Sequence, residues 1–145
     1  MITILKLTAP DADVCRAING LLQDLSATPH SVDEACLREL ASCPHIHIFL
    51  ATDADTQACV GMYTLASSPL LTGTKVWLED VVVSNRWQGR GLGRHLVEDA
   101  IARARRLYPG ATLMLTSRPS RKAANHIYTT LFQPKETNVY SLKMK

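Results

Sequence analysis

The sequence lacks the features that would place this protein in or across a membrane. No apolar run approaches the roughly 18 residues that a membrane-spanning helix requires. The segment from Met1 to Leu7 is too short and alternates too regularly for the apolar core of a signal peptide. We therefore expect a cytoplasmic protein with no membrane partner.

Cysteine is scarce and scattered. The cysteines include no pair separated by two residues and none with a histidine at the spacing of a zinc site. The pattern therefore predicts neither a disulfide framework nor a bound metal, and we expect reduced thiols in the core. The four cysteines are Cys15, Cys36, Cys43 and Cys59.

The chain also has little excess of charge. Sixteen basic residues against 13 acidic ones give a net charge of +3 over 145 residues. Hydrophobic residues make up 46% and charged residues 20%, which is typical of a globular chain. A chain of this length buries about two-thirds of its unfolded surface. No repeat or linker interrupts it, so we expect a single domain over residues 1–145.

Hydrophobic periodicity predicts both strands and helices. Period-two alternation and short apolar runs indicate strands, whereas apolar residues three or four apart indicate helices. Ser31 to Glu34 forms a capping box with Ser31 as N-cap, and Ser120 caps the last helix. The order predicts an α/β protein of the α+β mixed-sheet type with helices on both faces. The expected strands are 2–7, 45–51, 58–66, 76–83, 112–116 and 137–143, and the expected helices are 10–25, 31–42, 92–107 and 120–131.

The most informative segment joins the strand at 76–83 to the helix at 92–107. It reads Gln88-Gly89-Arg90-Gly91-Leu92-Gly93-Arg94. The first N–H groups of a helix have no partner within it, and the helix dipole places positive potential there. Glycines let an anion approach these amides closely, and Arg90 and Arg94 add charge. The turn therefore predicts a bound phosphate.

Two familiar phosphate motifs do not fit this turn. A P-loop requires a Lys-Ser or Lys-Thr pair after its glycines, and none is present. A dinucleotide fingerprint requires a third glycine where Arg94 stands, and the preceding strand ends five residues too early. Basic residues concentrate between Arg86 and Lys122, which suits either a nucleic acid or the phosphates of a coenzyme. The coenzyme is the more economical interpretation, so we expect no nucleic-acid partner.

What does fit is the pattern Gln/Arg-x-x-Gly-x-Gly/Ala. Through it, Gln88 to Gly93 resembles the pyrophosphate-binding signature of the GNAT superfamily of N-acyltransferases. The element order is similar to the GNAT fold over nearly the whole chain, most specifically from Trp77 to Tyr128. The resemblance implies a mostly antiparallel central sheet of six to seven strands. It also implies an N-acetyltransferase that uses acetyl-CoA and acts on a primary amine of a small molecule or peptide.

The resemblance assigns residues to the cofactor. In the family the pantetheine arm lies along the fourth strand, which implies backbone pairing with Val81 and Val83 and contact with Val82. An asparagine and a tyrosine one turn apart on a later helix also contact the cofactor, and here they are Asn125 and Tyr128. The turn residues implied to hold the pyrophosphate are Gln88, Gly89, Arg90, Gly91, Leu92, Gly93 and Arg94.

Glu79 and Tyr128 are the two candidates for catalysis. Glu79 and the next residue, Asp80, are adjacent carboxylates in an apolar strand. They should point to opposite faces, and at least one should border a solvent-filled cleft. The family position makes Glu79 the general base, acting directly or through water, and Tyr128 the acid that protonates the departing thiolate. Three alternatives stay open: Asp80 as the base, a carboxylate that caps a loop, or one that pairs with Arg118.

The resemblance implies that the acceptor pocket is formed by the loop between the first two helices, Ser26 to Ser31, together with the loop Ser67 to Gly73 and the last strand. Gln23, Asp24 and His30, together with Asp80, are the candidate acceptor-binding residues. No cysteine is placed for a covalent intermediate, so direct attack in a ternary complex is the expected route. The rival hypothesis is a non-catalytic CoA-binding regulatory domain of the same fold. Apolar strands at the C-terminal end are also compatible with a homodimer.

One departure from the family pattern concerns the end of the last helix. The family commonly reads Tyr-x-x-Leu-Gly-Phe, whereas this chain continues from Tyr128 through Leu131 to Phe132 with no glycine. A glycine there would end the helix in a left-handed conformation. Either Pro134 forces a different exit, or a non-glycine residue is strained.

Overall fold

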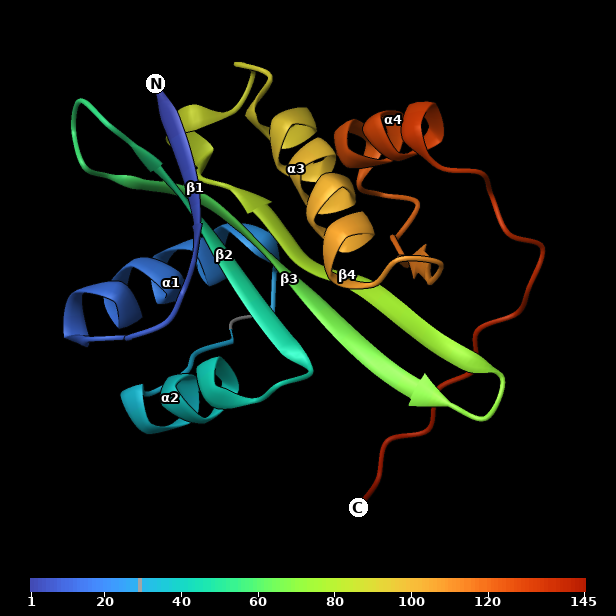
Figure 1. Cartoon of the computed structure of the whole chain (residues 1–145). Helices are drawn as coiled ribbons and strands as arrows, with labels where there is room; N and C mark the ends of the chain where they lie inside the picture. The colour runs from blue at the N-terminus through green and yellow to red at the C-terminus, as the bar shows by residue number, and fades with distance from the viewer. Residues whose placement is uncertain (29) are drawn as a thin grey trace.

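Five strands form one mixed sheet in a computed structural model that describes residues 1–28 and 30–145 (Figure 1). In spatial order they are β1 (Ile2–Lys6), β2 (Ile46–Asp53), β3 (Cys59–Leu70), β4 (Gly73–Val83) and β5 (Thr112–Met114). The first four strands pair antiparallel, and β5 pairs parallel with β4. The sheet is therefore mostly antiparallel, as expected. The expectation of six to seven strands was wrong for the described residues.

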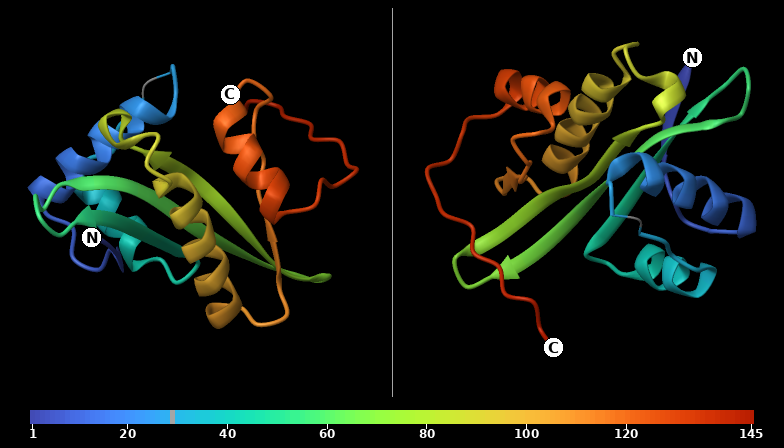
Figure 2. Two further views of the ribbon diagram at one scale, coloured as in Figure 1. Left: turned by 90° about the horizontal axis from the view of Figure 1, so that it is seen from above. Right: turned by 180° about the vertical axis from the view of Figure 1, so that it is seen from behind.

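Helices cover both faces of the sheet (Figure 2). On one face, α1 (Ala12–Leu25) and α2 (Glu34–Ser42) bury Leu21 and Leu37 against Met62 and Val82 of the sheet. On the other face, α3 (Leu92–Leu107) and α4 (Lys122–Leu131) pack on a second apolar cluster that includes Tyr63, Leu78 and Val81. A short 3-10 helix, Asn85–Trp87, connects β4 to the glycine turn.

A polar network fastens α3 to the sheet. The Tyr63 hydroxyl donates to Asp99 Oδ2 at 2.6 Å, and Arg103 Nε donates to the same oxygen at 2.7 Å. Arg103 also donates to the Ile4 carbonyl at 2.7 Å and lies 4.7 Å above the ring of Phe49. One arginine of α3 thus reaches β1 and β2 while its carboxylate partner reaches β3. Burial and the nearby Asp99 carboxylate raise the pKa of Tyr63 far above its ordinary value.

A β-bulge interrupts β4 opposite Tyr63. Met62 pairs with Val82 and Thr64 pairs with Glu79, so the one intervening residue of β3 lies opposite two residues of β4, Asp80 and Val81. Asp80 sits in this bulge with φ +54°, in the left-handed region. Because an extra residue reverses the alternation of side chains, Leu78 and Val81 both join the cluster under α3 although they are three residues apart.

Several local expectations were wrong. Asp33 and not Ser31 is the N-cap of α2, since its carboxylate accepts from the Cys36 N–H at 2.7 Å. Arg121 and not Ser120 holds the N-cap position of α4, without a side-chain cap. The expected strand at 137–143 is not formed, because residues 133–145 run as an exposed extended tail. The helix before the tail ends without strain, with Phe132 in an extended conformation at φ −122°.

Candidate functional site: a cleft between β4, α3 and α4

Strands β4 and β5 separate soon after they meet. They pair only from Lys75 to Trp77 against Thr112 to Met114, and β4 then continues alone to Val83. The edge of β4 that faces away from β3 is therefore open beyond Trp77, and its backbone groups need partners from elsewhere. Such an edge can bind an extended ligand by strand-like pairing.

The glycine turn lies beside this open edge, at the start of α3. Gly91 is the N-cap of α3 with φ +77°, and Gly89 has φ +79°. Both angles are in the left-handed region, where glycine is favoured, and the N-cap residue makes no side-chain hydrogen bond to the amides of the first turn. A Cβ on Gly93 would lie 3.2 Å from Ile127 Cδ1, so this glycine allows α3 and α4 to approach closely. The turn has the form of an anion cradle.

Two arginines flank the cradle. Arg94 is held by Glu98 at 2.9 Å and by Thr130 of α4 at 3.0 Å. Arg90 lies 4.4 Å above the ring of Trp87, which fixes its guanidinium next to the turn. Both side chains add positive charge to the field of the α3 N-terminus, which suits a pyrophosphate.

Hydrogen bonds connect the segment that leads into the cradle to the end of α1. Asp24 accepts from the backbone N–H of Asn85 at 3.1 Å and from its side-chain amide at 2.8 Å. Gln88 in turn donates to Asn85 Oδ1 at 3.0 Å. Asp24, an expected acceptor-binding residue, therefore links the end of α1 to the segment that enters the turn.

These parts enclose a cleft of about 730 Å³. It gathers most of the residues assigned to the cofactor, with Asp24 and Tyr128 on its wall. The expected site residues among its lining are Asp24, Val81, Val82, Val83, Gln88, Gly89, Gly91, Leu92, Gly93, Arg94 and Tyr128. The expected site residues outside its lining are Gln23, His30, Glu79, Asp80, Arg90 and Asn125.

Tyr128 and Arg121 meet on the α4 side of the cleft. The Tyr128 side chain is buried, which raises the pKa of its hydroxyl, and the positive charge of Arg121 and its hydrogen bond partly offset that rise. Arg121 also donates to the Val81 carbonyl at 3.2 Å, on the open edge of β4. Sequence reasoning missed Arg121. Arg121 is the N-cap residue of α4, seven residues before Tyr128, but its contact with the Val81 carbonyl joins residues 40 positions apart and has no local sequence signal.

Glu79 and Asp80 lie on the same side of the sheet, contrary to our expectation of opposite faces. Glu79 pairs directly with Thr64, and the Thr64 hydroxyl donates to Asp80 Oδ2 at 3.1 Å. The bulge explains this arrangement, because it turns Asp80 out of the regular alternation. Both residues are exposed. Partial desolvation and the neighbouring Asp80 carboxylate raise the pKa of Glu79, in the direction that suits a proton acceptor near neutrality.

The remaining expected residues lie apart from the cleft. Asn125 donates to the Arg118 carbonyl at 2.9 Å and so fastens the loop before α4. Gln23 and His30 are exposed near the end of α1 and after it. Within residues 1–28 and 30–145, no cluster of histidine, cysteine and acidic side chains has the composition of a metal site. None of the helices described there has the length and apolarity to cross a membrane.

Comparisons with known proteins agree on one fold. The model of the acetyltransferase (GNAT) family matches residues 18–132. Curated proteins give no match by sequence. An acetyltransferase from Trypanosoma brucei is 22% identical with a TM-score of 0.76, over 99% of this chain and 100% of that one.

Two further solved structures carry substrates in their names. An aminoglycoside acetyltransferase from an uncultured soil metagenomic sample, in complex with sisomicin, is 17% identical with a TM-score of 0.81, over 99% of this chain and 96% of that one. A ribosomal-protein-alanine N-acetyltransferase from Brucella melitensis is 15% identical with a TM-score of 0.79, over 100% and 99%. At these identities the likeness concerns the fold.

Proposed function

Because this chain belongs to the GNAT family of acetyltransferases, we propose that it transfers the acetyl group of acetyl-CoA to a primary amine. The acceptor is a small molecule or a peptide amine, and the amine attacks directly within a ternary complex. The observation that carries the proposal is the cleft itself, in which the cradle, the open edge of β4 and the Tyr128 side chain meet.

The cleft fits the chemistry of an acyl-CoA. The α3 N-terminus with Arg90 and Arg94 would hold the pyrophosphate, and the backbone of Val81 and Val83 would pair with the amides of the pantetheine arm. Bound there, acetyl-CoA supplies an activated acyl group. Arg121 now donates to the Val81 carbonyl, so this guanidinium must shift or share that oxygen when the arm pairs with β4.

The two candidate catalytic groups lie on opposite sides of the open edge. Glu79 and Asp80 are on the side of Thr64, whereas Tyr128 packs with the cluster under α3 and α4. An acceptor ammonium approaching from the first side can give its proton to Glu79, directly or through water, because a raised pKa makes this carboxylate a stronger base than an ordinary glutamate. Exposure of both carboxylates also favours a cationic acceptor.

Tyr128 holds a proton for the leaving sulfur. Its raised pKa keeps the hydroxyl protonated at neutral pH. A phenol is a weaker acid than an ordinary thiol, whose pKa is about 8.5, so the transfer requires help. Arg121 provides this help, since its positive charge stabilises the phenolate that remains after transfer. Arg121 is thus a positioning residue for the acid.

One assay, thiol release from acetyl-CoA, distinguishes the proposed enzyme from the rival hypothesis of a non-catalytic CoA-binding domain. Purified protein is incubated with acetyl-CoA and a panel of amines that includes aminoglycosides, polyamines, amino acids and an N-terminal alanine peptide, and thiol release is followed. Amine-dependent release that falls about 100-fold in Glu79→Gln supports the enzyme with Glu79 as base. A larger loss in Asp80→Asn would assign the base to Asp80. Tight CoA binding without release across the panel would support the rival.

A further inference from the structure

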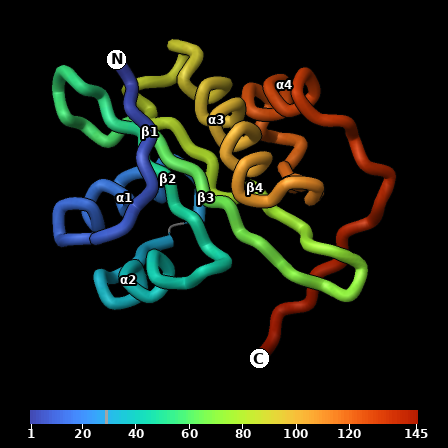
Figure 3. The backbone as a smooth tube through the Cα atoms, viewed as in Figure 1, coloured from blue at the N-terminus to red at the C-terminus, as the bar shows by residue number. Residues whose placement is uncertain are grey.

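Thr64 places a buried hydroxyl in the middle of β3. Its side chain is 8% exposed, and a buried hydroxyl needs a hydrogen-bond partner. The Thr64 hydroxyl donates to Asp80 Oδ2 at 3.1 Å, across the two strands β3 and β4 that Figure 3 shows side by side. Among residues 1–28 and 30–145, Asp80 is the only side-chain partner of this hydroxyl. The bond therefore joins the core of β3 to the bulge of β4.

Asp80 has a backbone conformation that most residues avoid. Its φ of +54° is left-handed, which strains a non-glycine residue, although aspartate tolerates this region better than most. Such strain persists where the surrounding structure enforces it. Tyr63, opposite the bulge, donates to Asp99 of α3 on one face of the sheet, and Thr64 donates to Asp80 on the other. The bulge is thus held by hydrogen bonds on both faces.

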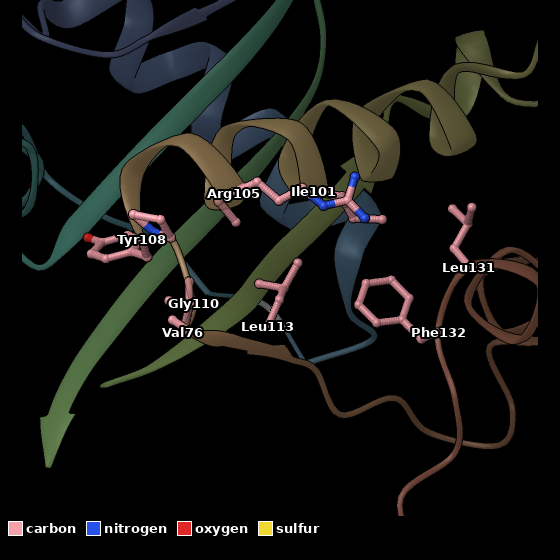
Figure 4. A pocket seen from close by; sticks show the side chains of 11 residues that line it. Val76, Ile101, Arg105, Tyr108, Gly110, Leu113, Leu131 and Phe132 are labelled. Carbon is pink, nitrogen blue, oxygen red and sulfur yellow. The ribbon is translucent and has the colours of Figure 1, made fainter. Parts of the chain in front are cut away.

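The carboxylate that accepts from Thr64 lies on the same face as Glu79. Before the bulge, β4 alternates regularly, and Val76 faces α3, where it borders the pocket at the end of that helix in Figure 4. Glu79 points to the opposite face, with Thr64 as its pairing partner. Without the bulge, Asp80 would point back under α3. The bulge and the Thr64 bond therefore keep both carboxylates on the face away from α3.

Asp80 is the charged neighbour of Glu79. The other residues that share this face with Glu79 on β2, β3 and β4 are uncharged, namely Ile48, Thr64 and Trp77. The charged side chains of α1, which packs on the same face, have partners elsewhere: Asp24 bonds Asn85, and Asp13 pairs with Arg16. Partial desolvation and the Asp80 carboxylate raise the pKa of Glu79. The position of Asp80 therefore affects how readily Glu79 takes up a proton.

We propose that Thr64 is a positioning residue for the proton acceptor, because its hydroxyl holds the Asp80 carboxylate beside Glu79 and so adapts Glu79 to take a proton from the acceptor ammonium. The inference rests on the proposed function, in which the amine gives its proton to Glu79. Thr64 acts through Asp80, so its hydroxyl should matter only while the Asp80 carboxylate is present. A bond that served the fold alone would not influence the titration of Glu79 in a folded variant.

Titration of Glu79 in the protein without substrates tests the positioning. NMR of the side-chain carboxyl carbon follows Glu79 against pH, and circular dichroism checks the fold of each variant. Thr64→Val removes the donor, so the pKa of Glu79 should fall, and Asp80→Asn should lower it at least as far. Thr64→Ala is a second variant without the donor. Ser68→Ala removes another hydroxyl from the same face of β3 and should leave the titration unchanged. Adding Thr64→Val to Asp80→Asn should have no further effect.

Kinetics connects the titration to the reaction. At saturating acetyl-CoA, the acidic limb of kcat/KM for the best amine should move to lower pH in Thr64→Val, and its plateau should fall about three- to tenfold. Thr64→Ser keeps the donor and should restore both.

Two results would overturn the proposal: an unchanged titration of Glu79 in folded Thr64→Val, or an equal effect of Thr64→Val with and without the Asp80 carboxylate. A different result separates this proposal from the proposed function. If the titration of Glu79 moves as expected but no amine causes thiol release, the positioning by Thr64 stands and the proposed function fails.

Discussion

At the scale of single residues, the pairing of Tyr128 with Arg121 leads to a kinetic prediction. Tyr128→Phe retains the ring in the core and removes only the hydroxyl, so the fold and the affinity for acetyl-CoA should be kept. The turnover number should fall about 100-fold, since the leaving thiolate loses its proton donor. Steady-state kinetics with the best amine of the panel checks this, and a change confined to KM would contradict the assignment.

Arg121 should act through Tyr128. In Arg121→Gln, the buried hydroxyl loses the positive charge that offsets its raised pKa, so the turnover number should fall about tenfold. Arg121→Lys keeps the charge and should recover most of that loss. The readout is the turnover number against pH for both variants. If Arg121→Gln loses activity equally in the presence and absence of the Tyr128 hydroxyl, its role is independent of the tyrosine.

His47 gives a prediction for stability against pH. Its ring is buried, Nε2 lies 2.7 Å from the Tyr108 hydroxyl, and Nδ1 has no partner among the described residues. Burial, reinforced by Lys6 and His45, lowers the pKa of His47 below the ordinary value of 6.5. As the pH falls through 6.5, His47 binds a proton in the unfolded chain, whereas in the native protein its lowered pKa keeps the imidazole neutral to a lower pH. The free energy of unfolding should therefore fall by up to about 1.4 kcal/mol per pH unit below 6.5.

Urea unfolding between pH 7.5 and 5 measures this effect. His47→Gln should lose the His47 part of the slope, whereas Tyr108→Phe, which keeps the imidazole, should retain it. A slope in His47→Gln equal to that of the wild type would show that the imidazole protonates alike in the folded and unfolded states.

At the scale of elements, two glycines in similarly open surroundings should respond oppositely to the same change. Apart from the adjoining backbone, no atom of the described residues lies within 4 Å of the Cβ position at either Gly20 or Gly91, but only Gly91 has a left-handed φ, +77°. Gly20→Ala in α1 should stabilise the protein by about 0.5–1 kcal/mol through helix propensity. Gly91→Ala should destabilise it by about 1–2 kcal/mol and weaken CoA binding. Urea unfolding measures the stability of both variants, and CoA titration measures their affinity for the coenzyme. Similar changes in Gly20→Ala and Gly91→Ala would contradict the cradle geometry.

The sequence predicted the elements whose signals are local. The five strands and four helices follow from periodicity, and the turn at Gln88 to Arg94 lies where its glycines placed it, at the start of a helix. The relation between Glu79 and Asp80 did not follow. It depends on a bulge opposite Tyr63, and nothing in an apolar run with period two indicates where the partner strand will slip by one residue.

The predicted strand at 137–143 shows a different limit. Its alternation is present in the sequence, since Tyr140, Leu142 and Met144 alternate with Ser141, Lys143 and Lys145, but a strand also requires an edge to pair with. Whether the chain reaches that edge depends on the exit from α4, where Phe132 is extended. Arg121 illustrates a third limit, since its role follows from where β4 and α4 meet in space.

At the scale of the whole molecule, the network of Tyr63, Asp99 and Arg103 should contribute much more than a surface ion pair of the same spacing. Asp99→Asn weakens contacts to both partners in a half-buried site and should lower the free energy of unfolding by about 1–3 kcal/mol. Glu98→Gln breaks the exposed i, i+4 pair with Arg94 on the same helix and should cost less than about 0.5 kcal/mol. Urea unfolding of both variants checks the contrast, and equal losses would contradict it.

The same network sets an order of events during synthesis. Arg103 bonds the carbonyl of Ile4, a residue 99 positions earlier in the chain. At translation rates of 5–20 residues per second, about 5–20 s pass between the emergence of the two partners. Strand β1 can pair with β2 well before that time. Its hydrogen bond from Arg103 forms only once α3 has been synthesised, and the first turn of α3 forms the cradle. The nascent chain therefore completes its oldest strand and the helix that begins at the glycine turn in the same late step.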